Sequence, residues 1–236
     1  MVPATINDVV RKANWSERLP QDQKELYLRV LGEARRRRLR FAIGGGLANN
    51  AYSSLWRNTR DLDLFVLPQD RERFIALLTE QGMTDYHDRQ PYDRSWIYRG
   101  YQTDQIVDVI WEMANHRARV DEIWVAAGPS VEIDGKQFPL IPVEETLWTK
   151  LYVMQRERCD WPDGLNLIAA VGPEIDWNRL IGRMGEDTAL LAGILTVFGW
   201  VCPQRAQDLP QWLWERGRAA PGAGNREPTI LTVVPG

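Results

Sequence analysis

Hydrophobic and polar positions follow two different periods along the chain, and these periods predict its elements. Leucines spaced three and four residues apart among charged residues predict an amphipathic helix over 22–39. The segment DLDLFVL at 61–67 alternates instead with the period of two that is typical of a strand. The same reasoning predicts further helices over 47–56 and 69–82, and further strands in 41–46, 95–101 and 105–113.

The pattern changes near residue 142. A hairpin over 131–141 is expected to turn at Asp134-Gly135. From Pro142 onward only helical patterns occur, beginning with proline at a first helical position and continuing at 164–170, 176–184, 187–201 and 204–216. We therefore expect an α+β fold, with a mixed sheet flanked by helices and followed by a helical half. The expected domains are an α/β core at 1–141, a helical domain at 142–216 and a flexible, glycine- and proline-rich tail at 217–236.

Composition narrows the class of protein. With 44% hydrophobic residues the chain has enough apolar side chains for a core, which excludes disorder throughout. The apolar run at 189–202 is shorter than the roughly 20 residues that a bilayer needs, so we expect a buried helix and no membrane partner. The N-terminal residues lack the pattern of a secretory signal, and a cytoplasmic protein is expected. Two cysteines and two histidines supply neither a zinc site nor a histidine-based catalytic triad, so any chemistry should rest on carboxylates.

Two carboxylates lie on one side of the strand predicted at 61–67. Residues two apart in a strand point to the same face, so Asp61 and Asp63 face one way while Leu62 and Leu64 face the core. A cation between them relieves their repulsion, and carboxylate oxygens suit Mg²⁺ or Mn²⁺. The alternative is an edge strand whose aspartates face water.

A third carboxylate, Asp108, interrupts the apolar strand predicted at 105–113. An ionised carboxylate in such surroundings costs several kcal/mol unless it is paired or bound to a metal. A metal site is one interpretation, and a pair with an arginine is the other. If the charge is isolated, replacing Asp108 by asparagine should destabilise the fold little or not at all.

Glycines 44–46 stand between a predicted strand and a predicted helix. Backbone N–H groups at such a junction approach an anion closely, and the helix N-terminus adds partial positive charge. We therefore assign Gly44, Gly45 and Gly46 to the binding of a nucleotide's phosphates, with a tight turn as the alternative.

Together these features resemble the nucleotidyltransferase superfamily of the DNA polymerase β type. The segment IGGGLANNAYSSLWRNTRDLDLFVL has its order of glycines, helix and alternating carboxylates, although the spacing from the glycines to the aspartates is long. The form Arg-x-Thr-x-Asp-x-Asp, which adds Arg57 and Thr59 as nucleotide-binding residues, is closest to minimal bacterial nucleotidyltransferases, including AbiE-type toxins. Those proteins carry a helical lysine followed by arginine and spaced aspartates, and LWTKLYVMQRERCDWPD at 147–163 is similar. The resemblance thus adds Lys150 as a nucleotide-binding residue, with Arg156, Asp160 and Asp163 as supporting residues.

The position of Lys150 agrees with this, because it flanks the apolar stripe of its predicted helix. A lysine so placed either extends to water or meets an anion, and a triphosphate is the anion that we expect.

The resemblance implies metal-dependent transfer of a nucleoside monophosphate from a nucleoside triphosphate to an acceptor, with release of pyrophosphate. Asp61, Asp63 and Asp108 would be its catalytic and metal-binding residues. The acceptor is RNA, protein or a small molecule, and a toxin role implies an antitoxin protein as a partner. The alternatives are an antibiotic-modifying nucleotidyltransferase and a non-catalytic nucleotide-binding module of the same fold.

Overall fold

The structure is a computed structural model that describes residues 5–11, 13, 15–154 and 158–218. The chain forms two compact units that divide between Thr146 and Leu147. The tail expected at 217–236 lies, from residue 219 onward, outside the described residues.

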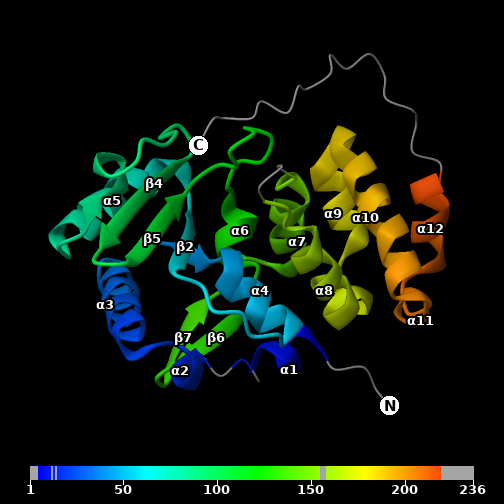
Figure 1. Cartoon of the computed structure of the whole chain (residues 1–236), viewed down its shortest axis with the longest axis horizontal. Helices are drawn as coiled ribbons and strands as arrows, with labels where there is room; N and C mark the ends of the chain where they lie inside the picture. The colour runs from blue at the N-terminus through cyan, green and yellow to red at the C-terminus, as the bar shows by residue number, and fades with distance from the viewer. Residues whose placement is uncertain (1–4, 12, 14, 155–157, 219–236) are drawn as a thin grey trace. The chain divides into compact units, whose positions relative to one another are not determined.

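The first unit is built on a five-stranded mixed sheet with the strand order β1-β2-β5-β4-β3 (Figure 1). Strands β2 and β5 pair in parallel, and the other neighbours pair antiparallel. The strands are β1 (Phe41–Ile43), β2 (Asp61–Val66), β3 (Thr84–Asp85), β4 (Ile97–Gln102) and β5 (Gln105–Ile110). This sheet, with the helices around it, confirms the expected α+β fold class.

One face of the sheet is apolar. Leu62 and Leu64 of β2 pair in register with Val107 and Val109 of β5, and all four side chains are fully buried. Helix α5 (Arg71–Glu80) packs on β4 and β5, and its Leu78 lies so close to Gly100 that a Cβ there would be 3.1 Å from the leucine side chain. Burial of this face supplies much of the core, because the hydrophobic effect scales with the apolar area removed from water.

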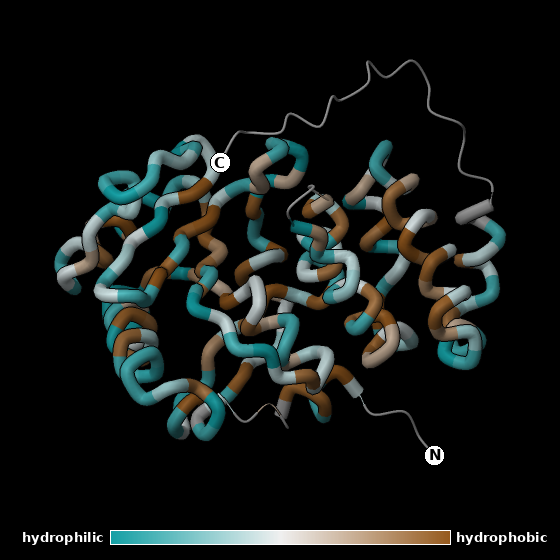
Figure 2. Tube along the Cα trace, viewed as in Figure 1, coloured by the Kyte–Doolittle hydropathy of each residue, from teal (hydrophilic) through white to brown (hydrophobic). Residues whose placement is uncertain are grey.

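The other face is divided along the strands. Toward the C-terminal ends of β2 and β5 it carries Phe65, which stacks on Trp124 of helix α6 (Glu122–Ala126) with ring centroids 5.2 Å apart. Toward the N-terminal ends it carries carboxylates, described below. In Figure 2 the strands of this sheet carry hydrophobic residues, as their buried positions require. The remaining helices of this unit are α1 (Ile6–Arg11), α2 (Trp15–Arg18), α3 (Gln21–Arg36) and α4 (Gly45–Ser53).

The expected hairpin is present as β6 (Ser130–Ile133) and β7 (Lys136–Pro139). Its turn residues Asp134 and Gly135 both have positive φ, at 47° and 73°. Two successive positive φ angles define the turn that fits the twist of a tight hairpin, which is why Asp-Gly predicts it.

The second unit is helical. Its elements are α7 (Val143–Tyr152, which begins in the first unit), α8 (Trp161–Val171), α9 (Trp177–Met184), α10 (Thr188–Val201), α11 (Pro203–Ala206) and α12 (Gln211–Arg218). The single helical pattern expected at 204–216 is wrong, because two helices occupy it. Pro210 has no N–H to continue the first helix and disfavours helical backbone at the preceding residue.

Helix α10 is buried on one side only. Leu191, Ile194 and Phe198 are inside the unit, whereas Trp200 is 85% exposed. In the described part of the chain, the stretch Trp177–Val201 is the one helical run whose length and hydropathy would also suit a membrane span. Gly185, with a φ of 53°, and the adjacent acidic residues Glu186 and Asp187 interrupt it between α9 and α10.

Candidate active site

Three carboxylates lie on one face of two adjacent parallel strands. Asp63 in β2 is in register with Asp108 in β5, and Asp61 shares its face because it lies two residues earlier. Asp61 and Asp63 are half-buried, whereas the side chain of Asp108 is only 2% exposed. The structure therefore brings together the three aspartates that the sequence singled out.

Asp108 has an ion-pair partner. Arg99 of β4 donates from Nε and from a terminal guanidinium nitrogen to the two carboxylate oxygens, at 2.8 and 2.6 Å. Arg99 and Asp108 are opposite each other in the antiparallel β4–β5 register, so both side chains rise from the same face. The hydrogen bonds to Asp108, and then its charge and those of Asp61 and Asp63, raise the pKa of Arg99 against the opposing effect of burial. Bidentate geometry of this kind is strong and directional.

This pair changes one expectation from the sequence. Asp108 is not an isolated buried charge, so its replacement by asparagine leaves a partly buried guanidinium without its carboxylate. The second interpretation from the sequence, a pair of Asp108 with an arginine, is therefore correct. This pair is compatible with a catalytic role for Asp108. Sequence reasoning did not single out Arg99. The available signal was a charged residue in the middle of a strand, flanked by Tyr98 and Gly100.

The glycines make room for Asp63. Strand β1 ends at Ile43, and α4 begins at Gly45 with a φ of 58°. A Cβ on Gly45 would lie 1.6 Å from Oδ2 of Asp63, so only glycine allows this approach. Gly44 N–H donates to the Asp63 carbonyl oxygen at 2.9 Å. The carboxylate of Asp63 thus lies at the N-terminus of α4, where the helix dipole favours negative charge.

The connection from α4 to β2 is fixed by side-chain amides. Asn50 of α4 binds both backbone groups of Arg57: its Nδ2 donates to the carbonyl at 2.7 Å, and its Oδ1 accepts from the N–H at 3.1 Å. Thr59 lies against Gly46, where a Cβ would be 3.2 Å from the threonine hydroxyl. Gly45 therefore contacts the Asp63 carboxylate, Gly46 contacts Thr59, and Asn50 holds the backbone of Arg57. The long spacing between the glycines and the aspartates is accommodated in this connection.

The donors that this face offers to a divalent cation are carboxylate oxygens. Within the part of the chain that the structure describes, no three His, Cys, Asp or Glu side chains are close enough together to hold a metal ion. Asp61 and Asp63 nevertheless provide the oxygen chemistry that Mg²⁺ and Mn²⁺ prefer, and such ions commonly take their other ligands from water and phosphates. Two carboxylates beside a helix N-terminus fit that mode of binding.

Lys150 belongs to the second unit and meets carboxylates of that unit. Its side chain is 4% exposed, and its Nζ lies 2.9 Å from Asp160 Oδ2 and 3.0 Å from Asp163 Oδ2. Arg158 also donates to both oxygens of Asp160, each at 3.0 Å. Burial raises the pKa of Asp160, but hydrogen bonds from Arg158 and the charge of Lys150 outweigh it and lower that pKa. The anions that Lys150 meets in this structure are the carboxylates of Asp160 and Asp163, and its contact with a triphosphate stays a prediction. Arg156 lies outside the described residues.

The fold and this arrangement of glycines and carboxylates define a protein of the nucleotidyltransferase class. The chain belongs to a family described as uncharacterised nucleotidyltransferases, whose model matches residues 28–190. This confirms the enzyme class expected from the sequence. No curated protein matches the chain.

Among solved structures, the antibiotic-resistance factor ANT(2″)-Ia is similar, with 19% identity and a TM-score of 0.46 over 78% of this chain and 96% of that one. The lincosamide antibiotic adenylyltransferase LnuA, bound to lincomycin, has 15% identity and a TM-score of 0.45 over 63% of this chain and 96% of its own. An antigenic nucleotidyltransferase-like protein from Paracoccidioides brasiliensis has 18% identity and a TM-score of 0.45 over 84% and 99%.

Proposed function

We propose that the protein transfers a nucleoside monophosphate from a nucleoside triphosphate to an acceptor hydroxyl, with Mg²⁺ or Mn²⁺ as cofactor. The acceptor oxygen forms a bond to the α-phosphorus, the bond from that phosphorus to the oxygen bridging to the β-phosphate breaks, and pyrophosphate leaves. The observation that carries the proposal is the register of Asp63 with Asp108, together with the contact of Asp63 against Gly45.

The roles of the side chains follow from their surroundings. Asp61 and Asp63 would hold the cation, which screens the charge of the triphosphate and of the leaving pyrophosphate when bound. Asp108 orients the acceptor hydroxyl or takes its proton, and Arg99 keeps its carboxylate in one orientation. The N-terminus of α4, with Thr59 against Gly46, would bind the phosphates, and Arg57 would contribute its positive charge.

The finer assignments rest on the resemblance in sequence. Similarity to AbiE-type toxins at 41–66 and 144–163 supports an RNA acceptor, an antitoxin partner and a contact of Lys150 with the nucleotide. The proposed cytoplasmic location rests instead on the two cysteines, which form no disulfide framework. Such a contact requires Lys150 to exchange one of its two carboxylate partners for a phosphate.

The test is incubation of the protein with each α-labelled nucleoside triphosphate, Mg²⁺, and either total cellular RNA or a panel of aminoglycosides and lincosamides. We expect pyrophosphate release and label on RNA, both lost in Asp61→Asn. Label on a drug would replace the toxin assignment by the antibiotic-modifying one. Nucleotide binding without transfer to any acceptor would overturn the proposed activity and favour a binding module.

A further inference from the structure

The connection between α4 and β2, residues 54–60, presents aromatic and basic side chains on a fixed backbone. Hydrogen bonds from α4 hold the middle of this connection, as described above. Gln23 of α3 holds its end, because the Nε2 of this glutamine donates to the carbonyl of Thr59 at 3.2 Å. On this backbone the side chain of Trp56 is half-buried and that of Arg60 is exposed. Both side chains therefore belong to a defined surface of the first unit.

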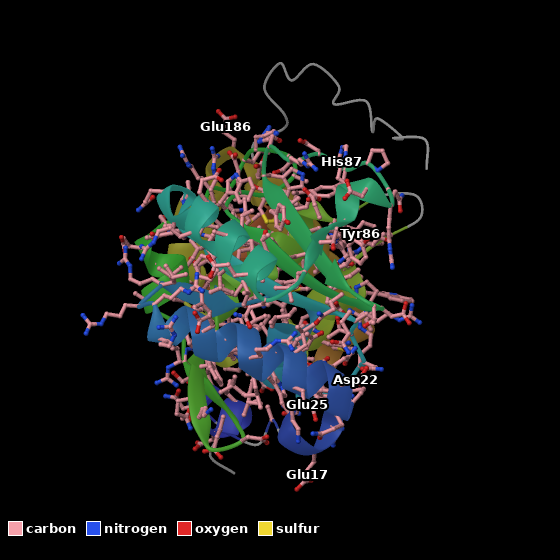
Figure 3. All side chains as sticks on the ribbon, turned by 90° about the vertical axis from the view of Figure 1, so that its left-hand side faces the viewer. Glu17, Asp22, Glu25, Tyr86, His87 and Glu186 are labelled. Atoms are coloured by element: carbon pink, nitrogen blue, oxygen red, sulfur yellow. The ribbon has the colours of Figure 1, made fainter. Side chains whose placement is uncertain are left out.

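Trp56 carries a cation over its ring. The guanidinium carbon of Arg18, in the last turn of α2, lies 5.9 Å from the centroid of the indole. Glu17 precedes Arg18 in this helix, and Figure 3 shows that its side chain points away from the body of the protein. An indole with a guanidinium over it is a flat cationic surface, and unpaired RNA bases stack on both kinds of group.

The charge of this surface is not neutralised by carboxylates. Among the residues that the structure describes, neither Arg18 nor Arg60 forms an ion pair. The arginine-rich end of α3 is the contrast, because Arg37 and Arg40 each lie 2.6 Å from a glutamate oxygen. Cations without a carboxylate partner attract the phosphates of a nucleic acid, and each such contact makes binding depend on salt.

The surface is also close to the carboxylates of the sheet. Trp56 precedes Asp61 by five residues, so their Cα atoms are at most about 18 Å apart even in an extended chain. A stacked strand advances about 3.4 Å for each nucleotide, so about five nucleotides at most cover that distance. A strand whose terminal hydroxyl lies at the carboxylates therefore reaches Trp56 with one of its last bases.

We propose that the surface formed by Arg18, Trp56 and Arg60 binds the single-stranded end of an RNA acceptor. A base stacks on Trp56 and Arg18, and the phosphates of the strand lie near Arg60. The inference rests on the proposed function, because it takes RNA as the acceptor and assigns the surface that holds it. An unpaired strand offers both base faces and phosphates to this surface, whereas a duplex keeps its base faces within its own stack.

The test measures binding of a fluorescent single-stranded RNA oligonucleotide to the full-length protein, without nucleotide, by anisotropy at several salt concentrations. For Trp56→Ala we expect the Kd for RNA to rise about tenfold, because base stacking is lost. Trp56→Phe keeps an aromatic ring and should restore most of the affinity. For Arg60→Gln the slope of log Kd against log salt should fall by about 0.7, as expected for one lost phosphate contact.

Two matched controls make the same changes elsewhere. Trp200 is 85% exposed in the second unit, and Arg73 lies 3.1 Å from a carboxylate oxygen of Asp70. Trp200→Ala and Arg73→Gln should therefore bind RNA as the parent does. Calorimetry with Mg²⁺–triphosphate is carried out on every variant, and its Kd should not change.

These measurements separate the inference from the proposed function. If the parent binds Mg²⁺–triphosphate but not RNA, or if Trp56→Ala binds RNA as the parent does, the RNA surface is wrong and the proposed function stands. Weaker triphosphate binding in Trp56→Ala would overturn the inference by making Trp56 a nucleotide contact. An unchanged salt slope in Arg60→Gln would overturn it even if Trp56→Ala did not fold. RNA affinity that depends on Trp56, in a parent that binds no triphosphate, would support the surface and contradict the proposed function.

Discussion

Each unit of this protein buries a cluster of cations and carboxylates, and the two clusters differ in their balance of charge. In the second unit, Lys150 and Arg158 meet Asp160 and Asp163, so two cations face two carboxylates. On the sheet of the first unit, Arg99 is the cation paired with Asp108, while Asp61 and Asp63 share the same face. Three carboxylates therefore lie along one face of this sheet, beside a guanidinium that is paired with Asp108.

This difference in arrangement distinguishes a cluster that stabilises the fold from a site that binds a ligand. Cations and carboxylates in close contact satisfy one another, so a further ion must displace one of them, and removal of one partner is costly. An excess of carboxylates costs stability, because like charges repel and burial disfavours ionisation. Carboxylates gathered in this way are typical of functional sites. The following predictions test this contrast, in order of decreasing expected effect.

The largest effect is expected from Asp108→Asn. It removes the carboxylate on the acceptor side, so nucleotide transfer should fall by about 10²–10⁴, with nearly unchanged binding of the triphosphate. It also leaves Arg99 without its partner, which should cost about 1–3 kcal/mol in the free energy of unfolding, since Arg99 is one-third exposed. Transfer rates and chemical denaturation measure the two effects. Transfer at the parent's rate would remove Asp108 from the mechanism.

In the second unit, Lys150→Met should act mainly on stability. It leaves two carboxylates without their ammonium, so the free energy of unfolding should fall by about 3 kcal/mol. Arg158→Met is the matched control: its side chain is 64% exposed, and its loss should cost less than about 1 kcal/mol. Weaker triphosphate binding at unchanged stability would reverse the assignment and make Lys150 a nucleotide contact alone.

A smaller effect should follow from Gly45→Ala. The positive φ of this residue strains alanine by about 1 kcal/mol, and the added Cβ also pushes the Asp63 carboxylate from its place. Gly135→Ala has a similar strain, with φ of 73°, but nothing within 4 Å of the new Cβ. The two variants should therefore lose comparable stability, whereas Gly45→Ala alone should lose nucleotide transfer. Equal activity in both would contradict the close contact.

The smallest effect concerns pH. Because the folded state lowers the pKa of Asp160, this carboxylate contributes stability that is present above its unfolded pKa of about 4. That contribution is lost as the pH falls through the lower pKa of the folded state. The unfolding free energy of the parent should thus decrease below about pH 4 more steeply than that of Asp160→Asn. Parallel curves for the two proteins would show that the pair contributes nothing to acid sensitivity.

The sequence predicted the fold class and the shared strand face of two aspartates, because strand alternation is a local property. Asp61 and Asp63 follow from a period of two, and the hairpin follows from Asp134-Gly135. It could not predict partners that depend on register between strands, so Arg99 was missed. The break between α11 and α12 was predictable from Pro210, but the apolar spacing over 204–216 is that of one continuous helix.

The most direct test of the central claim is a calorimetric titration of Mg²⁺–triphosphate into the parent and into Asp61→Asn/Asp63→Asn. Asp134→Asn, in an exposed hairpin turn, is the control for the same chemical change. The double variant should remain folded and lose measurable binding, whereas the control should bind as the parent does. Binding of equal affinity in all three proteins would contradict the claim that the carboxylate face of the sheet holds the nucleotide's cation.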